Sequence, residues 1–172
     1  MTPLAYAGQI VVPTAIDAMK NPADKRLAYL TCIAVYHLLD YLALASITET
    51  KSNRERKEKC EEAAKDIRTR MEARCPSEFK AVGDICNGLK HPARAIRPED
   101  AVIEIPRFKS GIMGSVFYVG PGMGPSLAVQ VDGKLIFLDQ CIMTVLETFR
   151  DLYPDKLMAS AALDEWRRGN SF

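Results

Sequence analysis

Histidine and cysteine are scarce in this chain of 172 residues, and their spacing argues against several kinds of site. There are two histidines, His37 and His91, and five cysteines, none of them arranged as Cys-x-x-Cys. A zinc knuckle needs paired ligands of that kind, and an odd number of cysteines does not suit a disulfide framework. The cysteines are therefore interpreted as reduced thiols, which predicts a cytoplasmic protein.

The chain also lacks an excess charge and a long uninterrupted hydrophobic run. It carries 23 basic and 22 acidic residues, a net charge of +1, so no overall field attracts nucleic acid or an anionic membrane. An RNA partner would need a local basic patch, for which the run from Lys90 to Lys109 is the candidate. The longest apolar stretch, Leu27 to Ile47, is interrupted by His37 and Asp40, so we expect no membrane partner. We also expect no signal peptide, because no basic region precedes an apolar one.

The first residues contain prolines that limit regular structure. Pro3 and Pro13 fall within residues 1–14, and residues 15–20 predict only one or two helical turns. Asn21 then suits an N-cap, with Pro22 at the first position of a new helix.

The most apolar part of the chain predicts a long central helix that runs to about Ile47. A helix that is apolar almost all round is packed on several neighbours. We therefore expect its polar residues His37 and Asp40 to be buried or half-buried. Residues 54–74 alternate in charge, which is typical of a solvated helix face. The helical pattern resumes after Cys75-Pro76 and ends at Pro92.

Short strands are predicted after residue 92. Residues 101–106 and 115–119 have strand character, and two apolar runs at 127–131 and 134–137 are joined by Asp132-Gly133, the signature of a type I′ hairpin. From Asp139 onward an amphipathic stripe predicts a last long helix, followed by a short helix over residues 155–166.

Together these patterns predict a single domain, residues 1–172, of the α+β class and mainly α. A helical hairpin over residues 23–92 forms the core of an antiparallel helical bundle. A small antiparallel β-meander is inserted at 101–137, before a closing helix at 139–153.

The residues with chemical potential fall into two clusters on the two long helices. His37 and Asp40 are spaced i, i+3, and Asp84, Asn87 and His91 are spaced i, i+3 and i+7, which places each set on one helical face. Antiparallel helices can bring the middle of the first beside the end of the second. The two clusters would then face each other.

Three interpretations of these clusters remain open. The first is a buried polar network in which aspartate and asparagine complete the hydrogen bonds of a neutral histidine and fix the helix register. The second is catalysis, because an aspartate on one ring nitrogen raises the basicity of histidine, while Asn87 and Lys90 could stabilise an anionic phosphate. The third is a metal site, although bundle metal sites use glutamate and neither cluster contains one. We expect no metal and no cofactor.

The combination of His37-x-x-Asp40-Tyr41 with Asp84-x-x-Asn87-x-x-Lys90-His91 resembles a set of uncharacterised bacterial proteins. More widely, it is similar to the HEPN superfamily of helical bundles, many of which are ribonucleases of defence or toxin–antitoxin systems. The resemblance covers residues 23–92. HEPN ribonucleases have an arginine, a polar residue and, after a gap of four to six residues, a histidine. His91 matches that histidine, but Asp84, Ile85 and Cys86 stand where the arginine belongs.

The resemblance implies a metal-independent ribonuclease that forms a homodimer or binds a small protein partner. His91 would be the general acid or base, Asn87 and Lys90 the phosphate contacts, and His37, Asp40 and Asp84 the surrounding residues that orient it. The missing arginine leaves the alternative of a non-catalytic interaction or structural protein whose cluster is a buried polar network.

Overall fold

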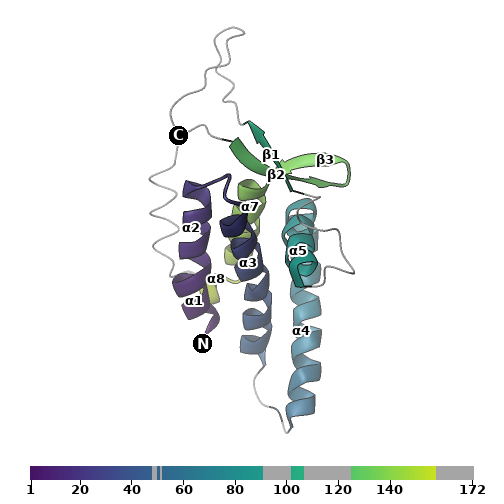
Figure 1. Ribbon diagram of the computed structural model, residues 1–172. Coiled ribbons are helices and arrows are strands. Elements are labelled where there is room, and N and C mark those ends of the chain that lie inside the picture. Colours follow the sequence, from purple (N-terminus) through teal and green to yellow (C-terminus); the bar gives the residue numbers. More distant parts are fainter. Residues whose placement is uncertain (48–49, 51, 91–101, 107–124, 158–172) are drawn as a thin grey trace.

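The computed structural model is a helical bundle with a three-stranded antiparallel sheet at one end (Figure 1). The structure describes residues 1–47, 50, 52–90, 102–106 and 125–157. This mainly helical α+β architecture, with the sheet placed before the closing helix, confirms the predicted fold class. The elements in chain order are α1 (Pro3–Tyr6), the π-helix η1 (Ala7–Val11), α2 (Val12–Lys20), α3 (Lys25–Ser46), α4 (Asn53–Arg74), α5 (Pro76–Lys90), β1 (Val102–Pro106), β2 (Pro125–Val131), β3 (Lys134–Phe137), α7 (Leu138–Leu152) and α8 (Pro154–Leu157).

Residues 3–20 are helical, so the prediction of limited regular structure there is wrong. Pro3 and Pro13 lie in the first turns of α1 and α2. Proline is tolerated at the start of a helix, where a backbone N–H has no intrahelical acceptor. Tyr6, Val11 and Ala15 from this segment are buried in the core. Burial against the bundle thus holds the segment in helical form.

The predicted start of the central helix is also wrong. Asp24 is the N-cap of α3, and its carboxylate accepts a hydrogen bond of 3.0 Å from the backbone N–H of Leu27. Asn21 instead ends α2, where its side-chain amide donates to the carbonyl of Asp17. A carboxylate at the N-cap accepts a hydrogen bond from a backbone N–H that has no acceptor within the helix. Asp24 supplies this carboxylate three residues after Asn21, the predicted cap.

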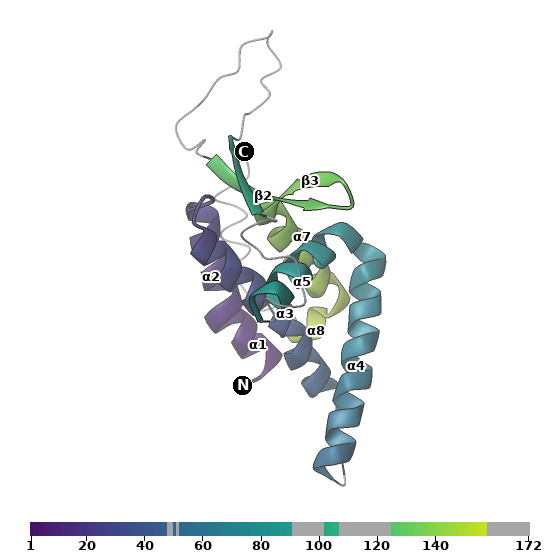
Figure 2. The same ribbon diagram turned by 45° about the vertical axis from the view of Figure 1, so that its right-hand side comes forward.

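Helix α3 lies in the middle of the bundle, with α2 on one side and α4 and α5 on the other (Figures 1 and 2). One broad face of α3 is sealed inside, including Val35, Leu38 and Leu39, each at most 1% exposed. Helix α5 packs on α3 through Tyr36, whose ring stacks on Phe79 with centroids 5.7 Å apart. Phe79 in turn meets Phe149 of α7 edge-on. Aromatic contacts therefore connect α3, α5 and α7.

The sheet has the order β1-β2-β3, and both pairings are antiparallel. The Asp132-Gly133 hairpin is confirmed, with positive φ at both residues, 49° and 79°. The predicted strand at 101–106 is confirmed as β1, and the one at 115–119 lies outside the described residues. The N–H of Leu127 in β2 donates a hydrogen bond of 3.1 Å to the carbonyl of Pro22, which lies between α2 and α3. This bond connects the sheet to the bundle.

Helix α7 confirms the predicted closing helix and its apolar stripe. Ile142, Val145, Leu146 and Phe149 are at most 6% exposed. Helix α8 follows, and the remainder of the predicted helix over residues 155–166 lies outside the described part of the chain beyond Leu157. Lys156 of α8 donates to the carbonyl of Ala45, close to the end of α3.

Candidate functional site

The first cluster is a surface pair on α3. The i, i+3 spacing on the helix places Nδ1 of His37 3.1 Å from Oδ2 of Asp40. A carboxylate at Nδ1 favours the tautomer with its proton there and leaves Nε2 as the acceptor. The pair is thus arranged so that Nε2 of His37 can accept a proton.

The expectation that both residues are buried or half-buried is wrong for Asp40. Its side chain is 63% exposed, whereas that of His37 is 33% exposed. Most residues of α3 are apolar, but the helices that the structure describes around it bury one broad face of α3. Which face stays open depends on the packing of α1, α2, α4 and α5, and the composition of α3 does not reveal it.

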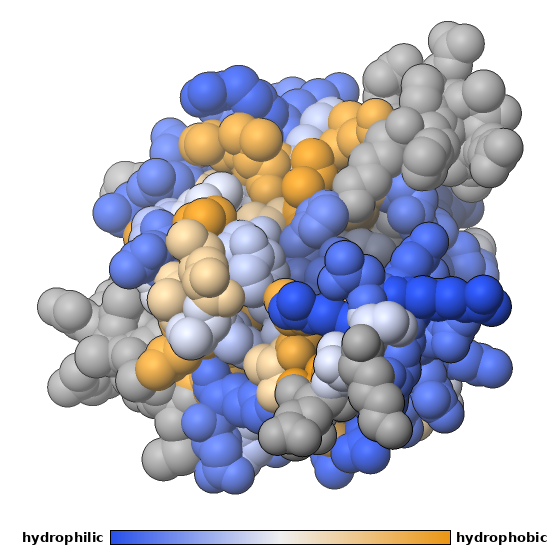
Figure 3. Space-filling view, turned by 90° about the horizontal axis from the view of Figure 1, so that it is seen from below, coloured by the Kyte–Doolittle hydropathy of each residue, from blue (hydrophilic) through white to orange (hydrophobic). Residues whose placement is uncertain are grey.

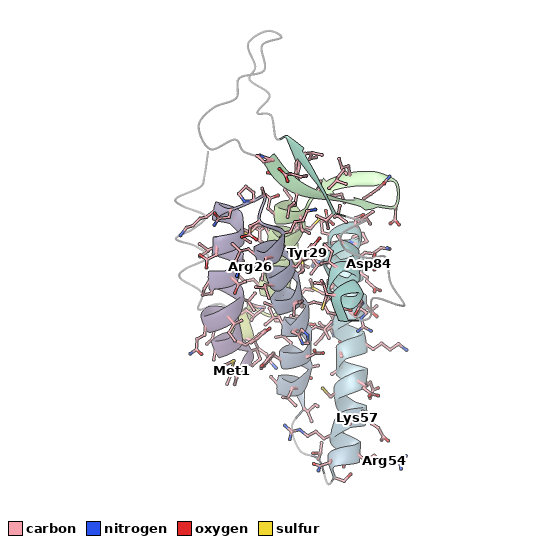
Figure 4. The ribbon with its side chains drawn as sticks, viewed as in Figure 1. Met1, Arg26, Tyr29, Arg54, Lys57 and Asp84 are labelled. Carbon is pink, nitrogen blue, oxygen red and sulfur yellow. The ribbon has the colours of Figure 1, made fainter. Side chains whose placement is uncertain are left out.

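The second cluster lies on α5 and is likewise at the surface. Nζ of Lys80 lies 2.6 Å from Oδ2 of Asp84, and both side chains are 51% exposed. This hydrogen bond is the main cause of the raised pKa of Lys80. Asn87 is exposed one turn further on, and Figure 4 shows where Asp84 lies on α5. Because Asp40, Asp84 and Asn87 are exposed, they do not form the buried polar network that the first interpretation requires.

The predicted site is therefore described only in part. The backbone of Lys90 ends α5, and the predicted roles of Lys90 and His91 rest on side chains outside the described residues. Helices α3 and α5 are in contact as predicted. Of the described members, His37 and Asp40 form one close pair, while Asp84 pairs with Lys80 on its own helix.

Two tyrosines lie beside the His37–Asp40 pair: Tyr41, which belongs to the motif quoted above, and Tyr6, which the sequence did not single out. Tyr6 of α1 stacks on Tyr41 of α3 with ring centroids 4.0 Å apart, and its hydroxyl donates to the carbonyl of Ala34 at 3.1 Å. Burial, and then the proximity of Tyr41 and Asp40, raise the pKa of Tyr6 to about 12. Tyr6 stays protonated near neutral pH and packs α1 along one edge of the exposed face of α3.

A second feature that the sequence analysis missed is the exposure of apolar residues on that face. Leu30 and Leu44 are 47% and 39% exposed, and Ile33 between them is partly exposed. We use the term α3 seam for Leu30, Ile33, His37, Asp40 and Leu44, whose spacing of three and four residues places them along one face. Among the partly buried side chains described, Tyr36 and Tyr41 pack against the core and Ile33 does not.

Other parts of the surface look different. The outer face of α4 carries ion pairs within the helix, such as Arg54–Glu58 at 2.9 Å and Lys57–Glu61 at 3.8 Å, as expected for a solvated face (Figure 4). Figure 3 views the end of the molecule where α1 begins, and apolar side chains reach the surface there among hydrophilic ones. Leu4 of α1 is exposed, and so is Met1, which precedes the helix.

Two further properties bear on the predictions. In the part of the chain that the structure describes, no three His, Cys, Asp or Glu side chains are placed to hold a metal ion. Helix α3 is long and apolar enough to cross a membrane, with half of its apolar window buried, a test that the core helix of a soluble protein also passes. The cytoplasmic location and the lack of a membrane partner stay predictions.

Comparison with models of known protein families found no match, and comparisons with curated proteins and with solved structures found none either.

Proposed function

We propose that this protein is a helical-bundle interaction module that binds a protein partner through the α3 seam. The observation that supports this is an apolar helix in the middle of the bundle on which Leu30 and Leu44 are exposed and are not covered by the described helices. Single exposed apolar residues are ordinary, but an aligned set is typical of an interaction surface. Leu30, Ile33 and Leu44 are aligned on one helix in this way.

The polar pair at the centre of the seam fits this function. A central polar group in an apolar helix face fixes the register of a partner, at some cost in binding energy. His37 and Asp40 are already paired with each other, so a partner does not have to desolvate an isolated charge. The seam thus combines apolar contact area with one polar centre.

Site-specific photocrosslinking in producing cells tests this function. A photoreactive phenylalanine derivative replaces Leu30 on the seam or, in the control, Lys57 on the solvated face of α4, which is 79% exposed. We expect a single adduct of defined mass from position 30 and none from position 57. An equal pattern from both positions, or no adduct from position 30, would contradict the proposal.

The His37–Asp40 pair favours a second candidate, a metal-independent ribonuclease in which His37 is the general base in place of His91, the residue to which the HEPN resemblance gives that role. Nδ1 of His37 faces a carboxylate, and the imidazole is exposed enough to meet a substrate. Nε2 could then take the proton of a ribose 2′-hydroxyl as its oxygen attacks the adjacent phosphorus. The bond from phosphorus to the 5′-oxygen breaks, which leaves a 2′,3′-cyclic phosphate, and the departing 5′-oxygen takes a proton from water. On this hypothesis Asp40 orients the imidazole.

An RNA cleavage assay in EDTA tests this candidate. Wild type, His37→Ala and His91→Ala are compared on mixed RNA, and the melting temperature of each is measured. Cleavage that persists in EDTA and is lost in a folded His37→Ala variant would support the role of the surface pair. Loss only in His91→Ala would move the chemistry to the end of α5. Absence of cleavage by the wild type would remove this candidate.

A further inference from the structure

We propose that the partner of the α3 seam is a second copy of this chain, bound about a two-fold axis with the two α3 helices antiparallel. This inference rests on the proposed interaction function and names its partner. The reason is a symmetry in the order of residues along the seam. Reading in either direction from the middle of α3, the seam presents a polar residue first and an apolar one next.

The symmetry has a definite centre, midway between Leu38 and Leu39. A two-fold axis at that point places His37 of one copy opposite Asp40 of the partner. The same axis places Ile33 opposite Leu44 of the partner. Leu30 lies opposite Ile47, the partly buried residue that follows the end of α3. Each residue therefore meets one of matching character, as an isologous interface requires.

The seam has the spacing that allows two helices to interlock. Leu30, Ile33, His37, Asp40 and Leu44 are separated by alternating steps of three and four, the a and d positions of a heptad. The opposite side of α3, with Val35, Leu38 and Leu39, is sealed in its own bundle. Contact with a second copy would therefore use side chains that the fold leaves available.

Charge complementarity favours a second copy as the occupant. At the axis, a histidine and an aspartate from each chain alternate, so each imidazole has a carboxylate from either copy within reach. The net charge of +1 on the whole chain gives two copies almost no mutual repulsion.

Sedimentation of the purified full chain over a range of concentrations is the direct test. We expect twice the mass of one chain at high concentration, with reversible dissociation on dilution. Ile33→Asp should raise the dimer dissociation constant roughly a hundredfold, because the charge enters an apolar contact twice in a symmetric interface. The melting temperature shows whether the variant is folded, and Leu30→Asp at the more exposed position gives a second measurement.

A paired substitution identifies the antiparallel arrangement. Ile33 and Leu44 lie three turns apart, roughly 16 Å along one helix, so they cannot pair within a chain. The double variant Ile33→Asp with Leu44→Lys should recover most of the affinity lost in Ile33→Asp. The matched control, Ile33→Asp with Leu30→Lys, has the same charges and should not recover it, because Leu30 faces Ile47 of the partner.

The outcomes separate this inference from the proposed function. A wild type that stays monomeric, together with a crosslinked adduct of another mass at position 30, would overturn the second copy and keep the interaction function. A dimer that is insensitive to both Ile33→Asp and Leu30→Asp would place the interface elsewhere and contradict this inference. Equal recovery by both double variants would contradict the antiparallel register.

Discussion

Gly83 of α5 lies against the ring of Tyr36 of α3, so closely that a Cβ at position 83 would come within 2.9 Å of Cε2 of Tyr36. That ring is held from another side by its stacking on Phe79. The close approach of the two helices carrying the predicted clusters therefore depends on the missing side chain of Gly83.

Gly83→Ala should destabilise the protein by about 1 to 2 kcal/mol. Overpacking of a core contact costs about 1–3 kcal/mol, which exceeds the gain of about 1 kcal/mol from replacing a glycine within a helix. Denaturant unfolding followed by circular dichroism measures the difference. The matched control is Gly8→Ala, where nothing lies within 4 Å of the added carbon and stability should rise. A loss at position 83 no larger than at position 8 would contradict the close contact.

Asp24→Ala should reduce the free energy of unfolding by about 1 kcal/mol, because the N–H of Leu27 loses its acceptor. Asn21→Ala should have an effect within about 0.5 kcal/mol, as for an ordinary surface substitution. Urea unfolding of both variants compares the two caps. If Asn21→Ala were the more damaging, α3 would begin where the sequence alone places it.

Tyr6→Phe should make the protein less sensitive to alkali. The pKa of Tyr6 is raised from 10.0 to about 12 in the folded state, first by burial. Below pH 10 both states keep the proton, and between pH 10 and 12 the unfolded state loses it first, so the stability from this group falls as pH rises. Unfolding free energies measured from pH 8 to 11.5 should fall more steeply for the wild type than for Tyr6→Phe. Parallel curves would be inconsistent with the raised pKa.

Near pH 7 the same substitution should cost about 1 kcal/mol, because the hydroxyl of Tyr6 no longer donates to the carbonyl of Ala34. The cysteines are unchanged between the two proteins, so their own ionisation at high pH cancels in the comparison.

Cys60 should react with iodoacetamide roughly tenfold or more faster than Cys32 and Cys141. Cys60 is partly exposed, whereas the other two are fully buried, and burial is the main cause of their raised pKa. Mass spectrometry of peptides after timed alkylation measures the three rates, with denatured protein as the control. Rapid labelling of Cys32 or Cys141 in the folded state would show that the core opens readily.

Features of the fold that depend only on residues close together in the sequence were predictable. The Asp132-Gly133 turn is one, since its backbone conformation is set by two residues. The stripe of α7 is another, because Val145 and Phe149 repeat at helical spacing and are buried. The prediction at Pro3 was wrong because proline can either stop a helix or occupy its first turn. Only the packing of the segment in the fold decides between these two roles.

The candidate site was predictable only in part, for a related reason. The pairing of His37 with Asp40 follows from their spacing on one helix, and it is confirmed. The exposure of Asp40 depends on which side of α3 the other helices leave open, and no local pattern contains that information. Tyr6 lies beside the site through its packing on Tyr41, although it is distant in sequence.

The hydrogen bond from Leu127 to Pro22 has a consequence for the way the chain reaches its final form during synthesis. Helices α2 and α3 leave the ribosome long before β2 is synthesised. The carbonyl of Pro22, in the turn between them, therefore has no bond to Leu127 while most of the chain is still being made. The same holds for α1, which contacts α8 near the other end of the described chain. Partners so far apart in sequence make folding slow and leave apolar surface exposed in the meantime. A ribosome-bound fragment ending before β2 should therefore be much more open to proteolysis than the finished chain.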